Sequence, residues 1–371
     1  MAINPRLIKS SLEAIGPIAD KVVGHFYAVL FLIDPALRDL FPVAMDAQRD
    51  RLFQSLLRIG RDVENPVALT AYLQQLGRDH RKYGVSPGHY THVGTALVTA
   101  LARYAGDLWT EELQTSWGEA YQLAATVMIE AAGEQAQQTP AFWHGRVIRH
   151  EPRGSDLAVV TIEPDQLLPY QAGQYISVQT LRWPRVWRHY SVANRPRKDH
   201  LLELHVRAVP AGWVSSTLVY HTKVGDMLRL GSALGTMVLD DSSTRPILCI
   251  GGGTGISPIK AMVEEMARSD RPRSMQVFFG VRRLYELYDL GAFTRMALRY
   301  PWLTVAPVVS NEWDYPGLSG PVVEVAAGLA NWEEHDVYLC GPPAMVRTGL
   351  ARLEHAGIAP AQLHFDPWPE L

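Results

Sequence analysis

The chain has 371 residues, enough for two or three domains that each bury a core of their own. Its formal net charge of −3 gives no electrostatic reason to expect nucleic acid or a membrane surface as a partner. No apolar run in the sequence reaches membrane-spanning length, and the first residues lack the apolar centre of a signal peptide. These features predict a cytoplasmic multidomain protein without stable membrane insertion.

Residues 1–138 have the apolar spacing of helices and no convincing strand. One apolar stripe, formed by Leu69, Leu73 and Leu76, continues at the next helical turn in His80. A neutral imidazole that points into an apolar interior is either a hydrogen-bonded core histidine or an iron ligand. Taken alone, the spacing favours the core histidine.

A short polar segment at 137–140 ends the helical pattern. From there to residue 243, short runs of alternating apolar and polar residues predict strands separated by turns. The runs are 147–148, 157–162, 175–178, 202–206 and 227–230. Regular spacing of this kind is typical of a sandwich or barrel, so we predict an antiparallel β-barrel domain.

The segment 188–191, Arg-His-Tyr-Ser, has the chemistry that suits a flavin. An arginine can bind a diphosphate through two parallel hydrogen bonds. A tyrosine can lie flat against the isoalloxazine ring, and a serine can donate a hydrogen bond to the ring edge. A four-residue match is weak by itself, and an exposed Arg188 beside an ordinary strand tyrosine would be the simpler interpretation.

Residues 244–371 begin with a continuous apolar run at 245–250, which is typical of a parallel strand buried on both faces. A glycine-rich turn at 251–255 follows, and then a helix predicted over 259–267 with Ser257 as its N-cap. Glycines let a diphosphate approach the backbone at a helix N-terminus, where free amides and the helix dipole favour an anion. This order of elements predicts an α/β nucleotide-binding domain with a parallel sheet.

The first region resembles the globin domain of bacterial flavohaemoglobins. The matching segments occur in the family's order, at 25–27, 35–41, 48–49 and 117–121. The resemblance implies an all-α globin domain in residues 1–138 that binds haem b, with His80 as the iron ligand. It also implies these roles: Tyr27 and Gln48 as distal hydrogen-bond donors toward dioxygen, Phe41 and Leu52 as haem contacts, and Tyr90 as the residue that supports His80.

The second and third regions resemble the ferredoxin–NADP reductase family. The resemblance covers residues 140–243 as the FAD domain and 244–371 as the NAD(P) domain. The implied FAD-binding residues are Tyr175, Arg188, His189, Tyr190, Ser191, Val214, Ser215 and Ser216, with Trp368 against the isoalloxazine. The implied nucleotide-binding residues are Gly253, Thr254, Gly255, Ile256, Ser257, Pro258, Cys340 and Gly341, with Cys340 at the nicotinamide.

The choice between NADH and NADPH stays open. Arg282 and Arg283 lie near the strand end where the 2′-phosphate of NADPH would bind. Arginine is also common at this place in relatives that use NADH, so NADH is slightly favoured.

Two positions differ from the flavohaemoglobin pattern, and a third matches the family but loses its expected partner through one of these differences. Ala132 stands where the family has a glutamate late in the last globin helix, and Asp79 replaces a lysine directly before the proximal histidine. Asp366 matches an acidic position that couples to that lysine in the family. We expect haem binding to survive, but the electron push on an O–O bond and the flavin–haem contact to weaken.

The resemblance implies an enzyme in which electrons pass from NAD(P)H to FAD to haem, and nitric oxide and dioxygen become nitrate. One alternative is an NADH oxidase, or a peroxide or quinone reductase, whose globin does not detoxify nitric oxide. Another is a haem-based gas or redox sensor, which would be expected to carry a partner-binding tail. A reductase that serves a separate oxygenase would leave the globin region unexplained. The expected partners are small molecules, and the expected state is a monomer.

Overall fold

The structure is a computed structural model in which residues 3–366 are described. The chain forms two compact units, Met1–Phe142 and Trp143–Leu371, which we describe separately. Trp368, the aromatic residue expected at the flavin, lies outside the described residues.

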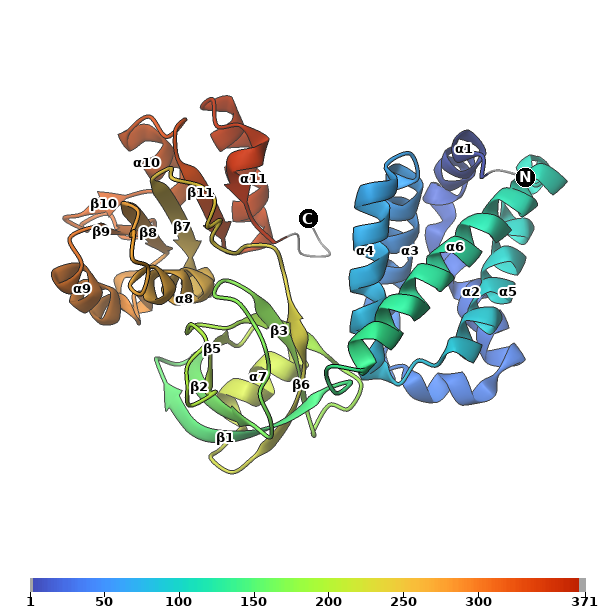
Figure 1. Ribbon diagram of the computed structural model, residues 1–371, viewed down its shortest axis with the longest axis horizontal. Coiled ribbons are helices and arrows are strands. Elements are labelled where there is room, and N and C mark those ends of the chain that lie inside the picture. Colours follow the sequence, from blue (N-terminus) through green and yellow to red (C-terminus); the bar gives the residue numbers. More distant parts are fainter. Residues whose placement is uncertain (1–2, 367–371) are drawn as a thin grey trace. The chain divides into compact units, whose positions relative to one another are not determined.

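Unit 1 is helical throughout its described residues, as predicted (Figure 1). Its helices are α1 (Pro5–Ile15), α2 (Ala19–Ile33), α3 (Asp46–Asp62), α4 (Pro66–His80), α5 (Pro87–Tyr104) and α6 (Glu111–Ala136). Local sequence explains where several of them begin. The side chains of Asn4, Asn65 and Thr110 accept hydrogen bonds from backbone amides of the first turns of α1, α4 and α6.

The apolar core of unit 1 consists of two separate clusters. The larger one joins α1, α2, α5 and the first half of α6. The smaller one is built on Leu69 and Leu73 of α4 and on Met128 of α6. Here α4 and α6 approach closely at Gly77, where an added Cβ would lie 2.3 Å from the carbonyl oxygen of Met128.

One stretch of unit 1, Pro5–Ile33, is long and apolar enough to cross a membrane by length and composition alone. The stretch is not a single apolar run in the sequence, and it counts as one helical span because α1, a short 3₁₀ turn and α2 follow one another directly. Ile8, Ile15 and Leu30 of this stretch are fully buried in the larger cluster, as is usual for core helices of a globular domain.

Unit 2 begins with an antiparallel six-stranded sheet that curls into a nearly closed barrel. Its strands are β1 (Trp143–Pro152), β2 (Leu157–Pro164), β3 (Tyr175–Thr180), β4 (Arg188–Ser191), β5 (Leu202–Arg207) and β6 (Met227–Leu234), in the order β4-β3-β6-β1-β2-β5. A bridge between Val192 and Leu204 joins the two edges of the sheet. The short helix α7 (Trp213–Tyr220) packs against the barrel through Val214 and Leu218.

The rest of unit 2 is a six-stranded parallel sheet with helices on both faces. Its strands are β7 (Ile247–Gly252), β8 (Met275–Val281), β9 (Leu303–Val309), β10 (Leu318–Ser319), β11 (Asp336–Cys340) and β12 (Leu363–His364). Its helices are α8 (Ile256–Met266), α9 (Leu290–Arg299), α10 (Val322–Leu329) and α11 (Pro343–His355), with 3₁₀ turns η5 (Gly253–Gly255) and η6 (Leu284–Glu286). Helices α8 and α9 cover one face, and α10 and α11 the other (Figure 1).

The predicted fold classes are confirmed, and most strands extend beyond the predicted runs. The start of one helix also differs. Helix α8 begins at Ile256 rather than Ile259, and Ser257 is not its N-cap. The reason is that the glycine-rich turn is itself helical, so that η5 runs directly into α8. The hydroxyl of Ser257 instead donates to the carbonyl of Thr254, at 2.7 Å.

Candidate functional site

His80 is the last residue of α4, and one nitrogen of its imidazole ring is available as a metal ligand. Its Nδ1 lies 2.7 Å from the carbonyl oxygen of Leu76. A carbonyl can only accept, so Nδ1 carries the proton and Nε2 keeps its lone pair. Burial lowers the pKa of His80, which favours the neutral form. Among the described residues, Nε2 has no hydrogen-bond partner.

Tyr27 of α2 is buried, at 5% exposure, close to the start of α3. Its hydroxyl lies 3.5 Å from the backbone carbonyl of Gln48. Burial raises the pKa of Tyr27 to about 12, so the hydroxyl remains a donor at neutral pH. The ring of Phe41 meets the ring of Tyr27 edge-on, with centroids 5.5 Å apart. The expected distal residues Tyr27, Gln48 and Phe41 are therefore neighbours.

The apolar surroundings fit a large flat group such as haem. Phe41 and Leu52 are partly buried side chains on the larger cluster of unit 1. Leu76 and Tyr90 are partly buried side chains on the smaller cluster. A group that covered both sets beside the free Nε2 of His80 would bury apolar surface that the chain leaves half exposed.

Tyr90 lies on α5, and its contacts differ from the expected support of His80. Its backbone carbonyl accepts a hydrogen bond from the hydroxyl of Tyr121, at 2.5 Å. Burial raises the pKa of Tyr90. The imidazole of His80 has its hydrogen bond to Leu76 instead, so the support by Tyr90 stays a prediction.

Asp79, which replaces the family's lysine, forms an ion pair with Lys82 one helical turn later. The Lys82 side chain is only 2% exposed, and its ammonium lies 5.1 Å from the ring centre of Tyr83. Tyr83 in turn meets His80 edge-on, with centroids 6.0 Å apart. Sequence reasoning missed this pair, although the i, i+3 spacing was a signal for it.

The expected flavin residues lie on β3, β4 and the N-terminus of α7. In the β3–β4 pair, Tyr175 faces Ser191 and Ser177 faces His189. Burial raises the pKa of Tyr190, and its hydroxyl has no hydrogen-bond partner among the described residues. A partly buried tyrosine hydroxyl beside the exposed Arg188 fits a ring with polar edges and a diphosphate.

Helix α7 supplies the second half of the expected flavin site. Gly212 is its N-cap, and the amide of Ser216 is the first to bond back, to the Gly212 carbonyl. The amides of Val214 and Ser215 therefore belong to the first turn, whose donors have no partner within the helix. The Ser215 hydroxyl donates to the Gly212 carbonyl at 3.2 Å. Such a turn fits a diphosphate.

The expected nucleotide residues lie at the switch point of the parallel sheet. From β7 the chain proceeds outward through β8, β9 and β10, and then returns to place β11 on the other side of β7. Ligands of such sheets bind at this point, beyond the carboxyl ends of the strands. Gly253, Cys340 and Gly341 follow or end these two strands. An added Cβ at Gly255 would lie 2.3 Å from the carbonyl oxygen of Cys340, so the turn needs glycine.

Cys340, at the end of β11, and Asp366 are two titratable groups that interact with each other. Burial raises the pKa of the Cys340 thiol to about 12, so it stays neutral. Burial also raises the pKa of the Asp366 carboxyl to about 6, although the Thr236 amide donates to it at 2.7 Å. A Cβ added at Gly235 would fall 2.6 Å from that carboxylate. Gly235 therefore leaves room for Asp366.

Three family models match the chain in succession. The globin model matches residues 24–128, the oxidoreductase FAD-binding domain residues 148–238, and the oxidoreductase NAD-binding domain residues 249–349. The expected haem, FAD and nicotinamide nucleotide are confirmed by these matches together with the relatives below.

The chain is similar to known proteins over nearly its whole length. A flavohemoprotein of Xylella fastidiosa (strain Temecula1 / ATCC 700964) is 26% identical over 97% of this chain and 94% of that protein. The reductase component of the naphthalene 1,2-dioxygenase system of Pseudomonas putida is 34% identical over 65% of this chain and 73% of its own. The crystal structure of a flavohemoglobin from Malassezia yamatoensis with bound FAD and heme shares the fold, with a TM-score of 0.81, 22% identity and coverage of 97% and 98% of the two chains.

Proposed function

We propose that this chain, which belongs to the flavohaemoglobins, oxidises nitric oxide to nitrate with dioxygen and electrons from NAD(P)H. The chain is an oxidoreductase with haem, FAD and a nicotinamide nucleotide as its cofactors. The conversion takes two NO, two O2 and one NAD(P)H to two nitrate ions, one NAD(P)+ and one proton. The observation that carries the proposal is the buried, protonated hydroxyl of Tyr27 in a globin fused to a reductase.

When bound, NAD(P)H would supply a hydride, FAD would divide its two electrons into single ones, and haem would supply a redox-active iron. His80 would hold the iron through Nε2, in an orientation fixed by the Leu76 carbonyl. Tyr27 would donate a hydrogen bond toward dioxygen on the distal side, with Gln48 beside it. Phe41 and Leu52 would exclude water there.

In the reductase unit, Arg188 and the first turn of α7 would bind the FAD diphosphate, and Tyr190 would lie against the isoalloxazine. The turn from Gly253 to Pro258 would bind the nucleotide diphosphate. Cys340 would present a neutral thiol at the nicotinamide, so it would add no charge there.

We assign residues 1–138, 140–243 and 244–371 to the three domains, and we propose the cytoplasm as the location.

The first test is an absorbance spectrum of the purified protein, repeated after addition of NADH under carbon monoxide without oxygen. We expect the flavin bands to bleach and the Soret band to shift to the ferrous carbon monoxide form. Nitric oxide should then speed aerobic NADH consumption well above the rate without it. A haem that stays ferric while the flavin bleaches would contradict the electron path.

An NADH oxidase is the second candidate, and one observation favours it. The imidazole of His80 donates to a neutral backbone carbonyl, and Asp79 is already paired with Lys82. Neither contact gives the imidazole the anionic character that favours O–O bond cleavage. NADH consumption that is fast with dioxygen and unchanged by nitric oxide would select this candidate.

A further inference from the structure

Strand β5 has one apolar and one polar face. Leu202, Leu204 and Val206 are buried in the barrel core. The residues between them, Glu203, His205 and Arg207, point to the opposite face, because side chains alternate along a strand. An outer barrel strand that faced only solvent would not bury a histidine, yet the His205 side chain is 1% exposed. The polar face must therefore be covered.

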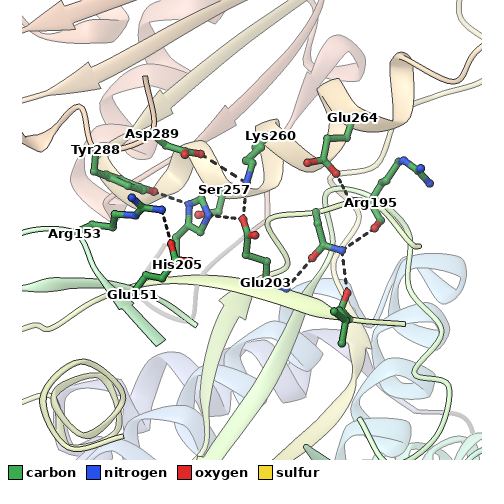
Figure 2. Close-up of polar contacts among 12 residues, drawn as sticks. Glu151, Arg153, Arg195, Glu203, His205, Ser257, Lys260, Glu264, Tyr288 and Asp289 are labelled. Atoms are coloured by element: carbon green, nitrogen blue, oxygen red, sulfur yellow. Dashed lines mark hydrogen bonds and ion pairs between the residues drawn. The ribbon is translucent and has the colours of Figure 1, made fainter. Parts of the chain in front are cut away.

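The nucleotide-binding half of unit 2 provides this cover (Figure 2). A carboxylate oxygen of Glu203 accepts from Lys260 of α8 and from Nε2 of His205, the latter at 3.0 Å. Nδ1 of His205 lies 2.8 Å from the hydroxyl of Tyr288, which follows η6. Arg207, the third residue on the polar face of β5, donates a hydrogen bond to Glu286 of η6 at 2.7 Å.

These contacts continue to the glycine-rich turn. The hydroxyl of Tyr288 is hydrogen-bonded to Ser257, at the start of α8. The Ser257 hydroxyl also lies 2.7 Å from the carbonyl of Thr254, inside η5. A continuous series of polar contacts thus runs from the barrel strand through His205 and Tyr288 to the turn that is expected to bind the nucleotide diphosphate (Figure 2).

Helix α8 is held at two further points. Lys260 also faces Asp289, at 3.8 Å. One turn later, Glu264 accepts from the backbone amide of Arg195 and from the guanidinium of Arg197, at 3.2 and 3.1 Å. Lys260 and Glu264 are four residues apart, so they share the face of α8 that meets the barrel.

The burial of these charges makes the contacts specific. The side chains of Lys260 and Glu203 are 12% and 19% exposed. Burial alone would raise the pKa of Glu203, but the hydrogen bonds from His205 and Lys260 hold it at about 2. Desolvated charges are tolerated only where partners meet them in good geometry, so a shifted domain would leave several unpaired. A polar cavity of about 170 Å³ lies beside these charges, between the barrel and the nucleotide-binding half of unit 2. Arg149, Arg153 and Arg295 form part of its lining.

We propose that Glu203, His205, Lys260 and Tyr288 act as positioning residues for hydride transfer. They fix α8 and its glycine-rich turn against the flavin barrel, and through them the nicotinamide relative to the flavin. None of the four is assigned a contact with a reacting atom. The inference rests on the proposed path from NAD(P)H to FAD and is independent of nitric oxide oxidation. Hydride transfer is sensitive to placement, because a displacement of about 1 Å can cost roughly 100-fold in rate.

The test compares Tyr288→Phe and Glu203→Gln with Glu163→Gln in the full chain loaded with FAD. Glu163 is the control because it forms an exposed ion pair with Arg146 on the same barrel. Flavin bleaching is followed without oxygen after mixing with saturating NADH, with NADH deuterated at C4, and with dithionite. Dithionite needs no nucleotide, so its rate reports on the flavin site alone.

We expect Tyr288→Phe and Glu203→Gln to slow bleaching by NADH roughly tenfold or more, with a larger deuterium effect and an unchanged dithionite rate. The control should stay within about twofold of the parent chain. Variants as fast as the control would overturn the positioning role alone. A parent chain whose flavin is bleached by neither NADH nor NADPH would overturn the proposed function as well.

Variants of Lys260 test the contact between Glu203 and Lys260 independently. Lys260→Arg keeps the cation and should retain most of the rate, whereas Lys260→Met should lose as much as Glu203→Gln. The double variant Glu203→Gln/Lys260→Met should lose less than the product of the two single losses, because the two changes share the Glu203–Lys260 interaction. Losses that multiply would show that the two residues act separately, against the proposal.

Discussion

At the scale of single residues, the hydroxyl of Tyr27 is the group on which the proposed chemistry depends most. We expect Tyr27→Phe to lower nitric oxide turnover roughly tenfold, because a hydrogen bond of about 1.5 kcal/mol is lost. Turnover is measured as NADH-dependent consumption of nitric oxide at fixed haem content. Tyr104→Phe serves as the control, since Tyr104 lies near the end of α5 and packs against His25. Equal rates in both variants would remove Tyr27 from the mechanism.

The ion pair of Asp79 and Lys82 predicts unequal effects for its two partners. Asp79 is 20% exposed and can be hydrated, whereas Lys82 is 2% exposed. Asp79→Asn removes the carboxylate charge that faces a buried cation and should lower the free energy of unfolding by about 3 kcal/mol. Lys82→Met replaces the cation with an apolar side chain of similar length and should cost less than about 1 kcal/mol. Urea unfolding followed at the Soret band compares the two, and the reverse order would contradict this account.

Asp366 predicts a pH dependence of stability. Its pKa is raised to about 6 by burial, so the folded chain binds a proton that the unfolded chain has released above about pH 4. The free energy of unfolding therefore falls by about 2 kcal/mol as pH rises from about 4 to about 6, and is flat above that range. Asp366→Asn should remove this fall. Melting curves of both proteins at about pH 4.5 and about pH 7.5 test the prediction, which fails if the two respond alike to pH.

At the scale of elements, the glycine-rich turn between β7 and α8 is fixed by a backbone contact. Gly255→Ala would place a Cβ 2.3 Å from the carbonyl oxygen of Cys340, so β7 and β11 would have to separate at the proposed nucleotide site. We expect the Kd for NADH to rise at least tenfold, measured by quenching of flavin fluorescence, because a displacement of about 1 Å is costly in a positioned site. Gly328→Ala in α10 is the control, since its Cβ meets no atom within 4 Å. Tight NADH binding by both variants would contradict the prediction.

Much of the fold could be predicted from the sequence because its signals are local. The strand at 247–252 and the turn after it carry their pattern in adjacent residues, and so does the segment 188–191. The positioning contacts could not be found this way. Glu203 is 57 residues from Lys260, and His205 is 83 residues from Tyr288. The alternation along β5 was visible, but it does not say whether a polar face meets solvent or another domain.

At the scale of the whole molecule, the two electron transfers of the proposed path would place different demands on the fold. Hydride transfer requires donor and acceptor atoms about 3–3.5 Å apart. The barrel and the nucleotide-binding sheet accordingly form one compact unit, Trp143–Leu371, joined through the buried charges of β5. The globin is a second unit, Met1–Phe142, with apolar clusters of its own.

Separate cores predict separate unfolding transitions. Calorimetry of the full chain should show two transitions, one for each unit, because the described side chains of each cluster come from one unit only. FAD at about 100 times its Kd should raise only the reductase transition, by about 2.7 kcal/mol of stability. Removal of haem should lower only the globin transition. Glu203→Gln should broaden or split the reductase transition and leave the globin transition in place, since it breaks a contact inside one unit. A single transition that moves with either cofactor would mean that the units unfold together, and that the globin is as firmly coupled as the two halves of the reductase.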